Sequence, residues 1–214
     1  SLAEAGMVED AKKVFAKALE LKNGQYANVE MATAAAKLGR LDREFFSIAK
    51  QAAAGMKNEN RGWAFDAIGQ EYAKLGEMEN ARKCYSEAME KNSVRTGDGK
   101  LFVSLAVHLA EAGFFAEATN VFKQLIEKYG TNRVHGSQDE LEILALEIAK
   151  LIRLHPRFVN LAQEAAWGIR SEREDIKFRI DARIDAEMIK FEKKCGRTVA
   201  WNEWFSKDCS EASF

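Results

Sequence analysis

The amino-acid sequence predicts an all-α protein, and three observations support that fold class. The 214 residues include one proline, although average usage of about 5% would give on the order of ten. Sheets need many turns that recruit proline, whereas helices joined by short glycine-containing or polar loops do not. A short phrase ending in glycine recurs through the first half of the chain, and apolar residues follow helical spacing in the second half.

The overall composition argues against several classes of protein. The chain carries 32 basic and 33 acidic residues, and a broad nucleic-acid surface usually needs a basic excess. It has neither an apolar run long enough to span a membrane nor a leader of positive and then apolar residues, so we expect a soluble protein. Cys84, Cys195 and Cys209 are odd in number and form no Cys-x-x-Cys pair, which favours reduced thiols and a cytoplasmic location.

Four glycines end similar phrases and divide the first half of the chain into repeats spaced by 33, 37 and 37 residues. Glycine adopts the left-handed conformation that ends a helix at little cost, so each phrase predicts a helix end and a second helix two or three residues later. A hairpin of this kind leaves an apolar face open, and stacking buries it. The phrases are Leu2-Ala3-Glu4-Ala5-Gly6, Ala36-Lys37-Leu38-Gly39, Tyr72-Ala73-Lys74-Leu75-Gly76 and Leu109-Ala110-Glu111-Ala112-Gly113.

Three of these glycines are followed by a regular pattern in the second helix. An alanine comes five residues later, an aromatic residue four after that, and a small or apolar residue three later still. The alanine lets two helices approach closely, and the aromatic ring fills the space between one hairpin and the next. The sets are Ala11, Phe15 and Ala18; Ala81, Tyr85 and Ala88; and Ala118, Phe122 and Leu125.

On these residues the chain resembles the tetratricopeptide repeat family, whose unit is a helical hairpin of about 34 residues. The resemblance implies a right-handed α-solenoid of such hairpins, which in this family mostly binds other proteins. The best-matching unit is Phe65-x-x-Ile68-Gly69-x-x-Tyr72 followed by Gly76, Ala81, Tyr85 and Ala88. The next unit matches at Phe102, Leu105, Ala106, Leu109, Gly113, Ala118 and Phe122.

The unit around Gly39 departs from the family pattern. Glu44 stands where alanine is expected and Ile48 where the aromatic residue is expected, so we predict that its second helix is shifted or rotated. Counting back from Gly6 on the same register puts Ser1 inside a first helix, so we expect an incomplete first repeat with further repeats before it. The predicted organisation is a repeat array over residues 1–136 and a C-terminal helical extension or cap over residues 137–214.

Two capping boxes and one proline organise the last third of the chain. Ser137-x-x-Glu140 predicts a helix that runs to about Arg153, where Pro156 stops it. A second helix fits Arg157 to Trp167, ended by Gly168. Ser171-x-x-Glu174 then opens the longest predicted helix.

This longest segment alternates apolar and polar residues from Ile176 to Met188, a pattern typical of a strand when taken alone. No partner strand is present and the residue types favour helix, so we predict a helix with two apolar faces. We expect both faces to be covered within the chain, one by the last repeat and the other by Val199, Trp201, Trp204 and Phe205. The alternative is that one face is a homodimer or partner interface. One face holds Ile176, Ile180, Ile184, Met188 and Phe191, and the other holds Phe178, Ala182, Ala186 and Ile189.

The sequence offers no constellation of residues typical of an enzyme. His108, His135 and His155 lack metal-ligand spacing, and we expect His108 to be a packing residue of a repeat helix. The segment from Arg95 to Lys100 lacks the spacing of a phosphate loop, so we interpret it as a turn between repeats. We therefore expect no catalysis, no metal and no cofactor.

The family resemblance implies that the first helix of each hairpin lines a concave groove. Lys37 and Lys74, beside its floor, could hold a carboxylate or backbone carbonyls. Some family members bind the C-termini of chaperones through a clamp of polar side chains. Only Lys100 matches a residue of that clamp, so we do not expect this chain to bind chaperones in that way. The predicted floor residues are Tyr26, Val29, Thr33 and Ala36 in the first unit, Trp63, Asp66, Gln70 and Ala73 in the second, and Lys100, Val103, Val107 and Ala110 in the third.

The sequence therefore predicts a protein-interaction scaffold or adaptor that binds a partner segment in this groove, as part of a larger protein or complex. The alternative is a helical-repeat protein that binds single-stranded RNA, because related RNA-binding repeats share a similar hairpin. The near-neutral charge and the acidic Asp66 in the groove argue against that alternative.

Overall fold

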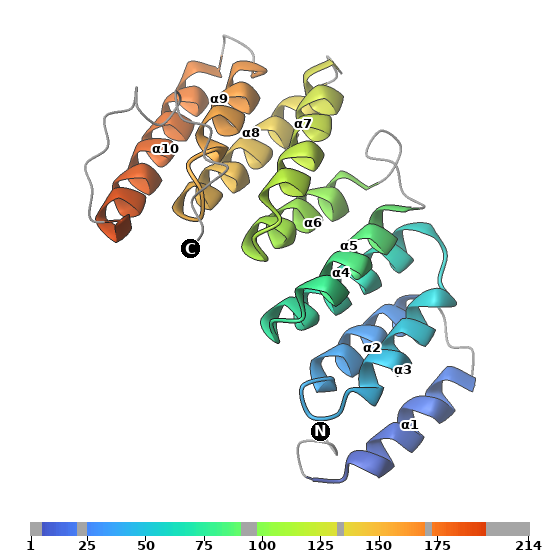
Figure 1. Ribbon diagram of the computed structural model, residues 1–214. Coiled ribbons are helices and arrows are strands. Elements are labelled where there is room, and N and C mark those ends of the chain that lie inside the picture. The colour runs from blue at the N-terminus through green and yellow to red at the C-terminus, as the bar shows by residue number, and fades with distance from the viewer. Residues whose placement is uncertain (1–5, 21–24, 91–97, 132–134, 170–172, 196–214) are drawn as a thin grey trace. The chain divides into compact units, whose positions relative to one another are not determined.

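The computed structural model describes residues 6–20, 25–90, 98–131, 135–169 and 173–195, and within these ranges the regular structure is helical with no strand (Figure 1). The predicted all-α class is confirmed. None of the described helices is long and apolar enough to cross a membrane.

The chain divides into two compact units, Ser1–Ala112 and Gly113–Phe214. This division differs from the predicted boundary between residues 136 and 137. The predicted boundary is based on where the repeat phrases end, and it stays a prediction. The first unit contains α1 (Val8–Glu20), α2 (Gln25–Leu38), α3 (Glu44–Ala54), α4 (Asn58–Lys74), α5 (Met78–Glu90) and α6 (Gly99–Glu111). The second contains α7 (Phe115–Thr131), α8 (His135–Lys150), the short 3-10 helix η1 (Leu151–Arg153), α9 (Phe158–Trp167) and α10 (Glu174–Cys195).

The first unit is built from helical hairpins placed next to one another. Helix α2 packs antiparallel on α3 and α4 packs on α5, so each pair forms a hairpin. The first helices of successive hairpins also contact one another, α2 with α4 and α4 with α6, while α1 packs on α3. Consequently α2, α4 and α6 form one layer of the unit.

The turn at Gly76 shows why the repeat phrase ends in glycine. Gly76 has a φ of 74°, which a residue with a Cβ atom adopts only at a steric cost. Its N–H donates to the carbonyl of Ala73, and the N–H of Glu77 donates to the carbonyl of Tyr72, the bond pattern of a Schellman motif. Gly6 and Gly113 also have a positive φ, 83° in each case, and each of these three glycines is followed two residues later by a helix.

The turn at Gly39 differs, as its sequence predicts. Helix α3 begins only at Glu44, five residues after Gly39, and its buried residues are Phe45, Phe46, Ala49, Ala52 and Ala53. Helices α1, α5 and α7 instead begin two residues after their glycines, so α3 starts later relative to its glycine than they do. This later start agrees with a shift, and the position of α3 within a family-like repeat stays a prediction.

The second unit packs around α8, which contacts α7, α9 and α10. Phe158 at the start of α9 is fully buried, and its ring meets those of Phe115 and Phe122 edge-on, at 6.1 Å between centroids in each case. Helix α9 matches the prediction closely. Helix α8 begins at His135, so Ser137 lies within its first turn rather than at its cap, and Ser171 lies outside the described residues.

Helix α10 is confirmed as a helix, and only one of its two apolar faces is buried. The isoleucines at 176, 180 and 184 are at most 3% exposed, whereas Phe178 is 74% exposed and Ile189 51% exposed. Ala182 and Ala186 are also exposed. Our expectation that the last repeat covers the buried face is wrong, since α8, η1 and α9 supply the main contacts. The proposed cover of the other face by Val199, Trp201, Trp204 and Phe205 lies outside the described residues.

His155 occupies the turn between η1 and α9. Its ring lies 4.9 Å from that of Phe115, and its Nδ1 accepts the backbone N–H of Arg157 at 3.1 Å. Burial, with a smaller contribution from the charge of Arg157, lowers the pKa of His155 to about 4. His155 is therefore neutral near pH 7 and supports the start of α9 as a hydrogen-bond acceptor.

The two faces of α10 should differ in their effect on stability. We expect Ile180→Ala to lower the free energy of unfolding of the second unit by about 2–5 kcal/mol, since it opens a cavity. We expect Phe178→Ala to change it by less than about 0.5 kcal/mol, since the ring is exposed. Hydrogen–deuterium exchange of α8 and α10 amides measures both. Equal losses for the two variants would mean that the face of Phe178 is covered.

His155 should make the second unit less stable on acidification. The unfolded chain takes up a proton at the ordinary histidine pKa of 6.5, but the folded unit does so only near pH 4. The unfolded state therefore binds more protons in this window, and stability falls as the pH is lowered through it. His155→Asn keeps an acceptor for Arg157 without a titrating ring. The free energy of unfolding is measured by urea denaturation above pH 6.5 and near pH 4. Between these two conditions the variant should lose less stability than the wild type. An equal loss in both proteins would contradict the role of His155.

Candidate functional site

The residues predicted to line the groove lie on α2, α4 and α6, and their side chains range from buried to exposed. Lys37, Lys74 and Lys100 are exposed, while Val29, Thr33, Trp63, Gln70, Ala73, Val103 and Val107 are partly exposed. Asp66, Ala36 and Ala110 are buried, at no more than 2% exposure. The side chain of Tyr26 lies outside the described residues. The layer of α2, α4 and α6 thus presents a mixed polar and apolar surface.

Asp66 forms a buried polar pair with His108 that joins α4 to α6. Both carboxylate oxygens of Asp66 lie 2.9 Å from His108 Nδ1, and the Asp66 side chain is only 3% exposed. Burial of an unpaired carboxylate is costly, so this arrangement stabilises both the carboxylate and the contact between the two helices. With Nδ1–H donating to Asp66, the lone pair of the neutral ring is on Nε2, which has no partner among the described residues.

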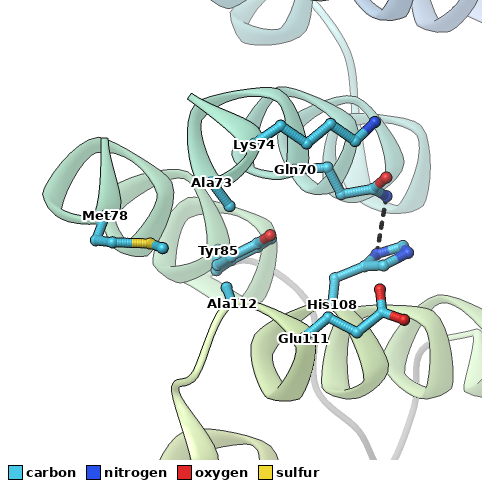
Figure 2. Close-up of a pocket in the computed structure, with 8 residues that line it drawn as sticks. All are labelled: Gln70, Ala73, Lys74, Met78, Tyr85, His108, Glu111 and Ala112. Atoms are coloured by element: carbon cyan, nitrogen blue, oxygen red, sulfur yellow. Dashed lines mark hydrogen bonds between the residues drawn. The ribbon is translucent and has the colours of Figure 1, made fainter. Parts of the chain in front are cut away.

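Two further side chains complete this polar cluster. Ser104 Oγ donates a hydrogen bond to Asp66 Oδ2 at 3.2 Å. The side-chain amide of Gln70 lies 2.9 Å from His108 Nδ1 (Figure 2). Our prediction that His108 is a packing residue agrees with its bond to Asp66, but its side chain is 20% exposed and also reaches a pocket.

The pocket lies where α4, the start of α5 and the end of α6 meet, and its volume is about 180 Å³. Figure 2 shows Gln70, His108 and Glu111 at one end, and Ala73 and Met78 toward the other, with the ring of Tyr85 between them. Lys74 and Ala112 complete the lining. Tyr85 is held in place because its ring packs on Gly69, where a Cβ atom would lie 2.6 Å from a ring carbon.

The charges around the pocket do not balance. Lys74 Nζ is already paired with Glu71 at 2.7 Å, whereas the exposed Glu111 has no partner among the described residues. Burial raises the pKa of the Tyr85 hydroxyl, and the negative charges of Asp66 and Glu111 add to the effect. The site therefore carries an excess of negative charge when His108 is neutral.

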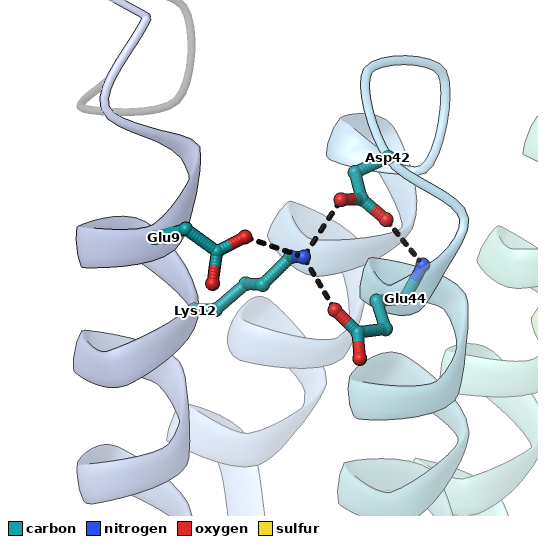
Figure 3. Close-up of polar contacts among 4 residues, drawn as sticks. All are labelled: Glu9, Lys12, Asp42 and Glu44. Carbon is teal, nitrogen blue, oxygen red and sulfur yellow. Dashed lines mark hydrogen bonds and ion pairs between the residues drawn. The ribbon is translucent and has the colours of Figure 1, made fainter.

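A second charged cluster surrounds Lys12, on α1 (Figure 3). Its ammonium pairs with Glu9 at 2.9 Å, with Asp42 at 2.7 Å, and with Glu44. Asp42 also accepts the backbone N–H of Glu44 at 2.8 Å, which supports the start of α3. The hydrogen bond from Lys12 holds the pKa of Asp42 below its usual value.

Glu9, Asp42 and Glu44 are close enough together to hold a metal ion. The Lys12 ammonium already lies among these three carboxylates and neutralises part of their charge. We therefore interpret the cluster as a link between α1 and the α2–α3 turn.

Of the residues that line the pocket, Gln70, Ala73 and Lys74 were predicted from the sequence as groove residues, whereas those on its other side were not. Tyr85 was predicted only as a packing ring, and Met78 and Glu111 were not singled out. The repeat spacing could have predicted these polar contacts. The residues of the bonded pairs Asp66–Ser104 and Gln70–His108 are each 38 positions apart, one more than the repeat of 37 residues between Gly76 and Gly113. Polar residues at this interval on successive first helices face one another.

Loss of the Asp66 charge should destabilise the first unit alone. We expect Asp66→Asn to remove about 1.5–3 kcal/mol, the usual contribution of a hydrogen bond to a charged group. Hydrogen–deuterium exchange should accelerate in α4 and α6 and stay unchanged in α9 and α10. The control is Glu79→Gln, at a side chain that is 77% exposed. Unchanged exchange in α6 would show that the pair does not hold the two helices together.

Comparison with protein-family models, with curated proteins and with solved structures finds no match to this chain. The resemblance to tetratricopeptide repeats therefore rests on the residues quoted above, and the function must be argued from the site itself.

Proposed function

We propose that this chain is a protein-interaction scaffold or adaptor that binds an extended segment of a partner along the surface formed by α2, α4 and α6. The observation that carries the proposal is the side-by-side packing of these three helices, most of whose described floor residues keep part of their surface accessible to solvent. In a helical-repeat protein, the first helix of each repeat contributes a few side chains, and together these helices form an extended binding surface. The proposal includes a tetratricopeptide-like, right-handed arrangement and no chemical reaction.

Trp63 is the anchor that we assign to this surface. It lies on α4, is partly exposed, and belongs to the class of residues that dominates binding energy at protein interfaces. Thr33 on α2 and Gln70 on α4 are partly exposed and supply hydrogen-bonding groups for the backbone of a bound segment. A surface of this composition suits a peptide better than a nucleic acid, because binding the phosphates of a nucleic-acid backbone needs several unpaired cationic side chains.

We also propose a cytoplasmic location. Cys195 is a free and exposed thiol, and Cys84 is free and buried, where desolvation raises its pKa to about 11. Free thiols of this kind persist in a reducing compartment. A high pKa keeps Cys84 in its unreactive thiol form.

Trp63→Ala should abolish capture of the partner while leaving the fold intact. We would use the full chain as bait from an extract, identify captured proteins by mass spectrometry, and compare wild type, Trp63→Ala and Trp167→Ala. Trp167 is the matched control because it is 78% exposed and belongs to the second unit. Helical content by circular dichroism should be the same for all three.

The outcomes of this experiment separate the competing functions. Proteins retained by wild type and Trp167→Ala but lost from Trp63→Ala would support the groove. Equal recovery by all three baits would contradict it. Recovery that disappears after ribonuclease treatment would favour the RNA-binding alternative instead.

A further inference from the structure

The pocket beside His108 has the size of a site for one side chain. Its volume of about 180 Å³ is well below the roughly 300–1,000 Å³ of sites that enclose a whole small-molecule ligand. All of its lining residues come from α4, α5 and the end of α6, within the first unit. Two of them, Gln70 and Ala73, are floor residues of the surface that we propose to bind a partner segment, so a single partner side chain is the natural occupant.

One part of the pocket suits an aliphatic stem. Ala73, Met78 and the ring of Tyr85 form this side (Figure 2). Met78 is 42% exposed and flexible, so it can adapt to a chain of methylene groups. Tyr85 is fixed by its contact with Gly69 and gives the stem a rigid wall.

The other part of the pocket suits a positive charge. Glu111 is exposed at its edge, and Asp66 is buried behind His108, 2.9 Å from its Nδ1. The hydrogen bond to Asp66 leaves His108 Nε2 as an acceptor when the ring is neutral. The carboxylate of Glu111 is a further acceptor at the same end (Figure 2).

The nearby cation does not reverse this preference. Lys74 is held by Glu71 at 2.7 Å and is 63% exposed, so its charge is both paired and screened by solvent. We predicted from the sequence that Lys74 could hold a carboxylate. An anion placed in the pocket would instead meet the unpaired Glu111 and the buried charge of Asp66.

We propose that this pocket binds a lysine or arginine side chain of the partner segment, with the aliphatic stem against Met78 and Tyr85 and the charged head at Glu111. The inference rests on the proposed function, since it assigns a residue class to one position of the bound segment. Amphipathic side chains of this kind bury their stems while the charged head keeps polar partners.

The probe for this proposal is N-acetyl-arginine amide, compared with the citrulline analogue, which has nearly the same shape without the charge. Binding is followed by NMR from the methyl group of Met78 and the ring protons of His108. Met188, in the second unit, is the internal control. We expect saturable shifts at Met78 and His108 with the arginine probe, none at Met188, and little response to citrulline.

Glu111→Gln should weaken binding of the arginine probe about fivefold, the effect of one solvent-accessible charge pair at the upper end of its usual range. Glu79→Gln, at an exposed position of α5 outside the pocket, is the matched control and should leave binding unchanged. Equal shifts with arginine and citrulline, or no shift at Met78 with either, would overturn the proposal. So would equal binding by wild type and Glu111→Gln.

The failure of this inference and the failure of the proposed function give different results. Partner capture that is lost in Trp63→Ala but kept in Glu111→Lys would leave the scaffold standing and reject the pocket. Saturable, charge-dependent binding of the arginine probe without any Trp63-dependent partner would keep the pocket and reject the scaffold.

Discussion

Close approach of paired helices through small residues is the constraint on which the first unit depends. A hairpin has too little surface to bury its own apolar face, so its helices must approach one another and the next hairpin closely. Gly69 shows how tight this is, because the ring of Tyr85 occupies the space that any side chain at that position would need. Ala81 and Ala88 are fully buried on the same helix as Tyr85. The fixed ring then forms a wall of the pocket, so the same contact that closes the hairpin also shapes the site.

The helices were predictable from the sequence because their end signals are local. The positive φ at Gly76 and the stop at Pro156 involve only neighbouring residues, and the sequence after Gly39, where α3 starts late, departs from the repeat pattern. The pair of Asp66 and His108 was not predictable in the same way, since it depends on the register between two first helices a repeat apart. His135 shows a further limit: α8 begins there, although the capping box places its start later, at Ser137.

Buried charge changes the interpretation of the groove. The sequence shows the charge of Lys74 but not its ion-pair partner, so it indicated that Lys74 could bind a carboxylate. In the structure Lys74 is paired with Glu71, and Asp66 is buried with His108 in front of it. The sign of the site is therefore decided by which charges have partners rather than by how many charges are present. The same reasoning applies to Lys12, whose ammonium fills the space among three carboxylates that would otherwise suit a metal ion.

The orientation of α10 is fixed by two independent sets of contacts. Ile176, Ile180 and Ile184 are buried against the rest of the second unit. Arg179 pairs with Glu142 of α8 at 2.7 Å, and Arg173 pairs with Asp139 of α8 at 2.6 Å. A roll of the helix that buried Phe178 would expose the isoleucines and break these ion pairs together. The exposed face is thus a consequence of stable packing, and anything that covers Phe178 must come from beyond the described residues.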